Sequence, residues 1–213
     1  DPIKDFVPLT LAGTLHNMLM VHPSVPARTV KEFILLAKAR PGQLNYSSSG
    51  IGTSAHLAGE LFKAMTGINI VHVPYKGGAP AMTAVIAGEV PLTFGSSSAL
   101  SQVRSGKLVV LGMTTPKRWA GLPDVPTIAE SGLPGYEIVN WFGVLAPAGT
   151  PNDLATKLSH EIVRILKLPD VRERLARQSI DVSAISGEEF GAYMRSEMAK
   201  WAKVIKDTGA RAD

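Results

Sequence analysis

A run of hydroxyl residues and glycines separates a short apolar segment from the start of an amphipathic one. Residues 44–47 have the character of a strand end, and apolar side chains recur at helical spacing from Ala58 to Met65. Gly67 is the expected C-cap of that helix. The residues in this run that could contact a ligand are Ser48, Ser49, Gly50, Gly52, Thr53, Ser54 and His56.

The chemistry that this run favours is the binding of an anion. Gly50 and Gly52 allow the backbone to bend and to approach a ligand closely. Thr53 or Ser54 can cap the helix, which leaves its first N–H groups pointing outward. A helix N-terminus carries roughly half a positive charge, so the run predicts an anion site. The alternative is a capped turn without a ligand, since the glycines match neither of the two phosphate-loop motifs.

A second hypothesis for the same run is an α/β enzyme that uses it as an oxyanion or phosphate cradle. Ser49 and His56 would be its nucleophile and base, but no Gly-x-Ser-x-Gly motif occurs and no acid is placed to orient the histidine. The five histidines lack metal-ligand spacing, and no paired carboxylates mark a cleft. We therefore expect no catalytic residue, no metal and no cofactor, and expect each histidine to be a capping or surface residue.

Two further glycine-rich turns follow strands in the same way. The segment 69–73 reads as a strand, and Tyr75, Lys76 and Gly77 then open a helix expected at 81–87. A third turn, 95–98, follows an expected strand at 90–94. In an open parallel sheet all three turns lie at the carboxyl ends of strands, where ligands bind. Lys76 either adds charge to the site or is a solvated turn lysine.

The alternation of strands and helices predicts a doubly wound α/β structure with a parallel sheet. The first two strands, 6–11 and 18–21, are expected to be joined by a polar turn. A connector rich in proline and glycine is expected between Thr114 and Tyr136, with one short helix around Ile128. The remaining expected elements are helices 30–39 and 99–104, strands 107–113 and 140–146, and three C-terminal amphipathic helices marked by Leu154 to Ile165, Val171 to Leu175 and Phe190 to Ile205.

Composition places the chain among ordered globular proteins. Its 213 residues are 45% hydrophobic and 19% charged, which suffices for one or two domains. The net charge of +4 is spread over helical faces that also carry acidic residues, so a nucleic-acid partner is not expected. Cysteine is absent, and no apolar run reaches the ~20 residues of a membrane span. No signal peptide is recognised in this sequence.

Several motifs together resemble one protein family. They are Asp1-Pro2-Ile3-Lys4-Asp5-Phe6; the run Leu44 to Gly50 continuing to His56-Leu57; His72-Val73-Pro74-Tyr75-Lys76-Gly77; Leu122 to Thr127 with Glu130, Gly132 and Gly135; and Trp141-Phe142-Gly143 with Ala146 to Pro151. In this order they resemble the Bug-type extracytoplasmic solute receptors of the tripartite tricarboxylate transporter (TTT) family. The resemblance runs through the whole chain.

The resemblance implies a periplasmic binding protein-like (type II) fold with two lobes. Residues 15–138 would form one complete α/β lobe, and residues 1–14 with 139–213 the hinge strands and C-terminal helices of a partial one. Family members are longer, with a further N-terminal segment in the first lobe. We therefore expect the partial lobe to expose apolar faces such as the stripe from Phe190 to Ile205, which could drive self-association.

The resemblance also implies a function without catalysis. Such receptors bind small carboxylates, namely di- and tricarboxylates, acidic amino acids or aromatic acids, and deliver them to membrane subunits of the TTT system in the periplasm. The loop from Ser48 to Ser54 and the turn from Tyr75 to Gly77 would hold one carboxylate by N–H groups and hydroxyls. A third hypothesis, the effector domain of a transcription regulator, would need a DNA-binding helix-turn-helix upstream.

Overall fold

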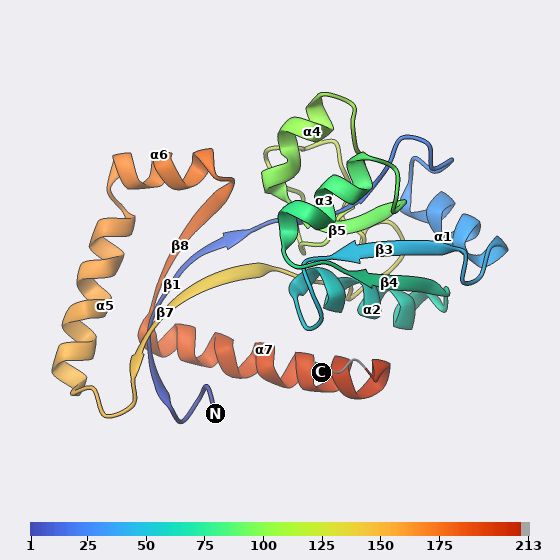
Figure 1. Ribbon diagram of the computed structural model, residues 1–213. Helices are drawn as coiled ribbons and strands as arrows, with labels where there is room; N and C mark the ends of the chain where they lie inside the picture. The colour runs from blue at the N-terminus through green and yellow to red at the C-terminus, as the bar shows by residue number, and fades with distance from the viewer. Residues whose placement is uncertain (210–213) are drawn as a thin grey trace. The chain divides into compact units, whose positions relative to one another are not determined.

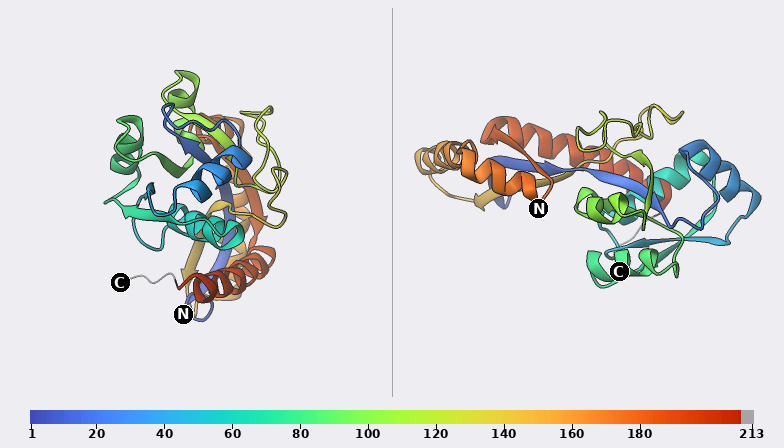
Figure 2. Two further views of the ribbon diagram at one scale, coloured as in Figure 1. Left: turned by 90° about the vertical axis from the view of Figure 1, so that its right-hand side faces the viewer. Right: turned by 90° about the horizontal axis from the view of Figure 1, so that it is seen from above.

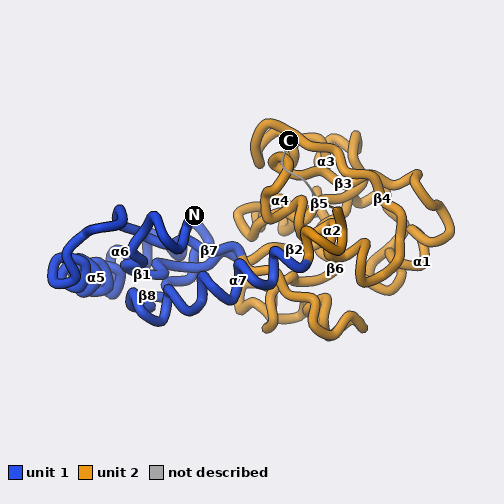
Figure 3. The backbone as a smooth tube through the Cα atoms, turned by 90° about the horizontal axis from the view of Figure 1, so that it is seen from below, with its two compact units in different colours: residues 1–15, 140–203 blue, residues 16–139, 204–213 orange. Residues whose placement is uncertain are grey.

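The structure is a computed structural model that describes residues 1–209. These residues form two compact units (Figure 3). Unit 1 comprises residues 1–15 and 140–203, and unit 2 comprises residues 16–139 with the segment that begins at Val204. Each unit has its own sheet and is described by itself.

Unit 2 is built on a five-stranded sheet with the strand order β4-β3-β5-β2-β6 (Figure 1). Its strands are β2 (Asn17–Val21), β3 (Leu44–Ser48), β4 (Ile70–Pro74), β5 (Leu92–Ser96) and β6 (Val109–Met113). β3 is parallel to both β4 and β5, whereas β2 is antiparallel to β5 and β6. The expected α/β class is confirmed, but the sheet is mixed, because β2 runs against the other four strands.

The helices of unit 2 form where the local sequence predicts, except that α3 begins at Gly78 and not at the expected residue 81. In α1, Thr29 and Glu32 form a capping box: the Glu32 N–H donates to Thr29 Oγ1 at 3.1 Å and the Thr29 N–H donates to Glu32 Oε2 at 3.2 Å. α2 ends at Gly67, whose φ of 67° is left-handed. The helical segments are α1 (Val30–Ala39), α2 (Ser54–Thr66), α3 (Gly78–Ile86), η1 (Ser97–Ala99) and α4 (Leu100–Arg104).

Apolar side chains cover both faces of this sheet. On one face Met18 and Met20 pack in a buried cluster with Ala84 and Val85 of α3. On the other, Phe62 of α2 contacts the rings of three residues that are also fully buried: Phe33, Phe94 and Tyr136. The strand ends that carry the polar turns are thereby fixed between two packed layers.

The connector between β6 and the next strand, β7 (Asn140–Pro147), contains no helix or strand (Figure 2). The prediction of a short helix around Ile128 is wrong. Thr127 and Glu130 do exchange hydrogen bonds like a capping box, but the segment closes as a single turn that ends at Gly132, where φ is 112°. A left-handed glycine stops the helix before a second turn can form.

Unit 1 holds a three-stranded antiparallel sheet with the order β7-β1-β8. β1 (Phe6–Leu15) runs straight through the segment expected to be a polar turn. Gly13 serves close packing here, because a Cβ on it would lie 2.8 Å from the carbonyl oxygen of Asp181 on β8. The strand β8 (Ile180–Ser186) was not predicted.

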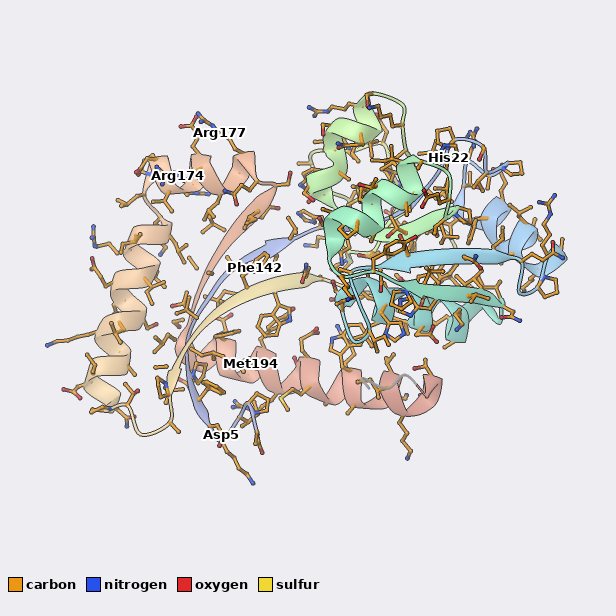
Figure 4. All side chains as sticks on the ribbon, in the orientation of Figure 1. Asp5, His22, Phe142, Arg174, Arg177 and Met194 are labelled. Atoms are coloured by element: carbon orange, nitrogen blue, oxygen red, sulfur yellow. The ribbon has the colours of Figure 1, made fainter. Side chains whose placement is uncertain are left out.

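Three helices complete unit 1: α5 (Asn152–Leu166), α6 (Pro169–Arg177) and α7 (Gly187–Thr208), and all three confirm the expected C-terminal helices. Phe190 and Met194 of α7 pack with Leu11 of β1 in a buried cluster, and Met194 is labelled in Figure 4. The first half of the stripe from Phe190 to Ile205 is therefore core, and only its later part can be the exposed apolar face expected of a partial lobe. Its later members Met198 and Ile205 are exposed.

The exposed apolar stripe of unit 1 lies mainly on α5. Leu154, Leu158 and Ile165 are 47%, 40% and 40% exposed, while Ala155, Ser159 and Leu166 face the unit's interior. The amphipathic helix is confirmed, and these three apolar residues are exposed, as expected for a partial lobe, whereas Ile162 packs against the core. Among residues 1–209, no helix combines the length and the apolar character of a membrane-spanning segment.

Candidate functional site

The first two polar turns meet at one edge of the sheet of unit 2. β3 and β4 are parallel neighbours in register, with Ser48 opposite Pro74, so the turns that follow them lie side by side. β5 is parallel to β3 on its other side, and its following residues form η1. The carboxyl ends of three parallel strands thus bring Ser48, Tyr75 and Ser96 to one edge, the place where open α/β sheets bind ligands.

Hydrogen bonds within the first turn fix its shape. The Ser48 hydroxyl accepts from the Gly50 N–H at 3.1 Å, and Thr53 Oγ1 donates to the Gly50 carbonyl at 2.7 Å. Gly50 and Gly52 have φ values of 136° and 77°, which glycine adopts without strain. The Gly52 N–H donates to His56 Nδ1 at 3.0 Å. The amides of both glycines are therefore bound within the protein, and they are not the open donors that the sequence suggested.

The second turn is attached to the first. The Tyr75 N–H donates to the Ser48 carbonyl at 3.0 Å, and the Gly77 N–H donates to the Ser49 carbonyl at 3.2 Å. These bonds extend the pairing of β3 and β4 beyond the strand ends. The two turns therefore form one rigid rim, in which Lys76 is exposed.

The open donors lie one step further along the chain, at the start of α2. Thr53 occupies the N-cap position with extended backbone, but its side chain makes no capping hydrogen bond. Within residues 1–209, the N–H groups of Ser54, Ala55 and His56 have no protein acceptor. The hydroxyls of Ser49 and Ser54 likewise have no protein partner among the residues described. An anion at this helix end would meet several donors and the positive end of the helix dipole.

Acidic residues are distributed so as to leave this helix end positive. Each of α1, α5, α6 and α7 carries Asp or Glu in its first turn, as helices commonly do. α2 and α3, which follow β3 and β4 at the edge described above, carry none, and neither has a side-chain cap. The two helix ends beside the polar rim are therefore free to accept a negative charge from a ligand.

Three aromatic rings stack beneath the first turn. The His56 and His72 ring centroids are 4.1 Å apart with planes 21° apart, and Tyr46 stacks on His72 at 4.9 Å. The Tyr46 hydroxyl donates to Glu60 Oε1 at 2.8 Å, and Glu60 is paired with Lys63 at 2.8 Å. His56 is buried and His72 half-buried, so neither is a surface residue. For His56 the expected capping role fits instead, because its Nδ1 accepts the Gly52 N–H at the start of α2.

This environment keeps both imidazoles neutral. Burial lowers the pKa of His56 below its usual value of 6.5. Burial, followed by the neighbouring His56, lowers the pKa of His72 to about 4. A neutral His56 presents an unprotonated Nδ1, as the Gly52 N–H requires of its acceptor.

The nucleophile and base considered from the sequence are not assembled. His56 uses Nδ1 to accept from the backbone. In this turn the serine that contacts a histidine is Ser48, whose Oγ lies 2.6 Å from His72 Nε2. Ser48 is itself buried beneath the turn. In the part of the chain that the structure describes, no group of three or more acidic or histidine side chains could hold a metal ion.

Three residues near this edge were not predicted as site residues from the sequence. Ala55 contributes only an N–H, which no side-chain pattern reveals. His72 joins the site through the pairing of β3 and β4, which places it opposite Tyr46. Asn17, at the start of β2 and opposite Ser96, is 2% exposed, and its Nδ2 has no partner among the residues described. Only a known strand register could have identified the last two.

Comparison with known proteins identifies the family to which this chain is similar. The profile of the family described as "Tripartite tricarboxylate transporter family receptor" matches residues 1–210. A protein encoded in the tcbD-tcbE intergenic region of Pseudomonas sp. strain P51 is 38% identical over 204 residues, which cover 95% of this chain and 61% of that protein. The chain thus spans about six-tenths of that relative's length.

Solved structures show the same fold. The chain is 37% identical to R. palustris Rpa4515 with adipate, at a TM-score of 0.89 over 98% of this chain and 70% of the other. It is 29% identical to the periplasmic binding protein BugD, at a TM-score of 0.88 over 100% of this chain and 72% of the other. It is 28% identical to MatC from Rhodopseudomonas palustris with bound malate, at a TM-score of 0.86 over 96% of this chain and 71% of the other.

Proposed function

Because the chain belongs to the tripartite tricarboxylate transporter family of receptors, we propose that it is an extracytoplasmic receptor for a small carboxylate. The family is one of solute-binding receptors, with Bug-type proteins among its members. The chain would bind its ligand, release it unchanged to membrane subunits of the transporter, and catalyse no reaction.

The observation that carries this proposal is the open N-terminus of α2. A carboxylate there would accept hydrogen bonds from the N–H groups of Ser54, Ala55 and His56 and from the hydroxyls of Ser49 and Ser54. Fixed dipoles of this kind bind a charge without a buried counter-charge. The exposed Lys76 on the neighbouring turn would add long-range attraction.

Dicarboxylates are the ligand class that we propose first. Two structures that resemble this chain carry adipate and malate, which are both dicarboxylates. Tricarboxylates, acidic amino acids and aromatic acids remain candidates within the same chemistry. Unit 2 would supply the grip described here, as the complete lobe of a two-lobed receptor. Unit 1 would be the partial lobe, and its exposed α5 stripe would allow self-association with a second copy.

The test is a thermal-shift screen of the chain with adipate, malate, citrate and benzoate at neutral pH. A ligand that binds only the folded protein raises the melting temperature as its concentration rises. We expect at least one dianion to do so. Adipamide, which has the length of adipate without its charge, is the matched control and should produce no shift.

A charge variant separates anion binding from general stabilisation. Ser54→Glu places a carboxylate in the first turn of α2, where it suits the helix dipole and should not lower stability. It should abolish the shift that the dianion produces, whereas Ser54→Gln should retain most of it. Equal shifts for adipate and adipamide, or an unchanged response in Ser54→Glu, would overturn the proposal.

A further inference from the structure

His56 occupies the third position of α2, where a capping box places Glu or Gln. From there its Nδ1 accepts the N–H of Gly52, the residue before the N-cap, at 3.0 Å. Glu32 of α1 makes the same contact, because its Oε2 accepts the Arg28 N–H at 2.6 Å, in addition to the Thr29 N–H of the capping box. The same chain therefore uses glutamate for this purpose in one helix and histidine in the other. What differs between the two acceptors is the charge.

The uncharged acceptor matters because of what the helix end would bind. A glutamate at position 56 would place a negative charge in the first turn, beside the N–H groups that have no protein acceptor, and would repel an anion there. A neutral imidazole supplies the lone pair for Gly52 without that charge. The loop can thus be fixed while the helix end stays positive.

The surroundings of His56 keep it neutral on balance. His72 of β4 stacks on it, and Tyr46 of β3 stacks on His72. The charged groups that face the two imidazoles are Glu60 and Lys63 of α2, which pair with each other. Glu60 favours the protonated form, but burial, which has the largest effect, and Lys63 oppose it.

Protonation of His56 has a direct mechanical result. A proton on Nδ1 would point at the Gly52 N–H, so two donors would face each other across 3.0 Å. The contact that ties the loop to the helix would then be lost. His72 lacks this sensitivity, because the Ser48 hydroxyl can serve its Nε2 as donor or as acceptor.

We propose that His56, stacked on His72, is a proton-sensitive clamp that holds the Gly50–Thr53 loop in its ligand-binding shape without adding negative charge. His56 is a positioning residue in this role, and the inference rests on the proposed function in that the loop borders the carboxylate site. Acidification would release the loop.

The first test reads the loop without any ligand. Amide hydrogen exchange of Gly52, followed by NMR, should be about fivefold faster in His56→Phe, which keeps a ring but has no acceptor. His56→Gln and His56→Glu should both retain slow exchange, since each can accept the Gly52 N–H. His22→Phe is the control, because His22 bonds to Ser24 on a loop that begins at the opposite end of β2.

The second test follows the proton. The side-chain nitrogen shifts of His56 should report an unprotonated Nδ1 at pH 7, with a titration midpoint below 6.5, and the Gly52 amide shift should move with the same midpoint. In His56→Gln the amide chemical shift of Gly52 should not change over the pH range in which His56 titrates in the wild-type chain. An ordinary His56 titration, an uncoupled Gly52 amide, or unchanged Gly52 exchange in His56→Phe would overturn the inference.

The third test separates the clamp from the function. Adipate is the probe, measured by calorimetry at pH 7 in the wild-type chain and the variants. We expect His56→Glu to bind adipate roughly tenfold more weakly than His56→Gln, although both hold the loop. If wild type binds no carboxylate, the proposed function fails, while the exchange and titration results still decide the clamp. Equal binding by His56→Glu would contradict the charge argument.

Discussion

At the scale of single residues, Tyr46 connects the site to the core. Its ring lies between His72 and Phe94, and its hydroxyl donates to the buried Glu60. Burial and the neighbouring Glu60 raise the pKa of Tyr46 well above its usual value, so the phenol keeps its proton at neutral and acidic pH. The histidine stack therefore rests on a ring that stays uncharged in the pH range where the histidines titrate.

Gly59 is the residue whose replacement should disturb this arrangement most directly. A Cβ at Gly59 would overlap the ring of Tyr46, which is fully buried and cannot move aside. We expect Gly59→Ala to lower the free energy of unfolding by about 1–3 kcal/mol, despite alanine's better helix propensity. Urea denaturation followed by circular dichroism measures this. Gly78→Ala is the control, because a Cβ there meets open space, and an equal loss in both variants would contradict the steric argument.

The two histidines make stability depend on pH in a defined window. Both have folded-state pKa values below the usual 6.5, that of His72 being about 4. The unfolded chain therefore takes up protons first, and stability should decline as pH falls from 6.5 towards 4. Urea midpoints measured across this range should fall with pH.

Urea midpoints of variants across the same pH range show which histidine causes the loss of stability. His72→Phe keeps the stacked ring without a titratable group, so its decline over this window should be shallower than that of wild type. His22→Phe should leave the decline unchanged. A wild-type stability that rises on acidification between these pH values would show that the histidines are not held neutral.

At the scale of elements, the N-termini of α1 and α2 differ in whether side chains satisfy their N–H groups. The start of α1 is closed by its Thr29 and Glu32 capping box, whereas that of α2 is open. We expect Thr29→Ala to destabilise unit 2 by about 1 kcal/mol, because it leaves the Glu32 N–H without its acceptor. Thermal unfolding monitored by circular dichroism measures the change.

Thr156→Ala provides the comparison for that variant. Thr156 lies at an exposed position in α5, where alanine has the higher helix propensity. Its melting temperature should stay the same or rise slightly. A loss as large as that of Thr29→Ala would mean that the capping box contributes nothing specific.

Elements whose signals are local were predictable from the sequence. The N-cap of α1, the left-handed Gly67 and the two glycines of the first turn all follow from short-range backbone chemistry. The segment around Gly13 misled because a glycine needed for close approach of β8 looks like a turn glycine. Strand β8 does alternate apolar and polar residues from Ile180, but Ala184, at φ 50°, interrupts the alternation.

The candidate site was predictable in place but not in detail. The Ser and Gly turn at a strand end marks the edge where a ligand would bind. Which amides stay open depends on contacts that no spacing rule contains, such as His56 Nδ1 with Gly52 and the Ser49 carbonyl with Gly77. The Ser49–Gly77 contact follows from the parallel register of β3 and β4, and the His56–Gly52 contact from the fold of the loop onto the start of α2.

At the scale of the whole molecule, the two units differ in how well their apolar surface is covered. Unit 2 buries side chains on both faces of its sheet, whereas unit 1 leaves Leu154, Leu158 and Ile165 of α5 exposed, and Phe142 of β7 (labelled in Figure 4) is exposed as well. Apolar patches of this kind commonly mark an interface.

We expect the α5 stripe to drive self-association. Leu154→Lys combined with Leu158→Lys should shift the chain toward monomer in light scattering at concentrations where wild type associates. Thr156→Lys combined with His160→Lys adds the same two charges to neighbouring exposed positions and should not. A wild-type chain that is monomeric at all concentrations tested would contradict the expectation.

The pairing of β1 also bears on the order in which the units can be made. Unit 2 draws its five strands from one continuous stretch, 17–113, and the connector that follows adds core residues such as Tyr136, so this unit can fold once residue 139 has left the ribosome. β1 comes earlier in the chain, yet both of its partners, β7 and β8, lie beyond residue 139. During synthesis β1 must therefore wait unpaired while unit 2 takes shape, and the nascent chain is most in need of a chaperone over that interval.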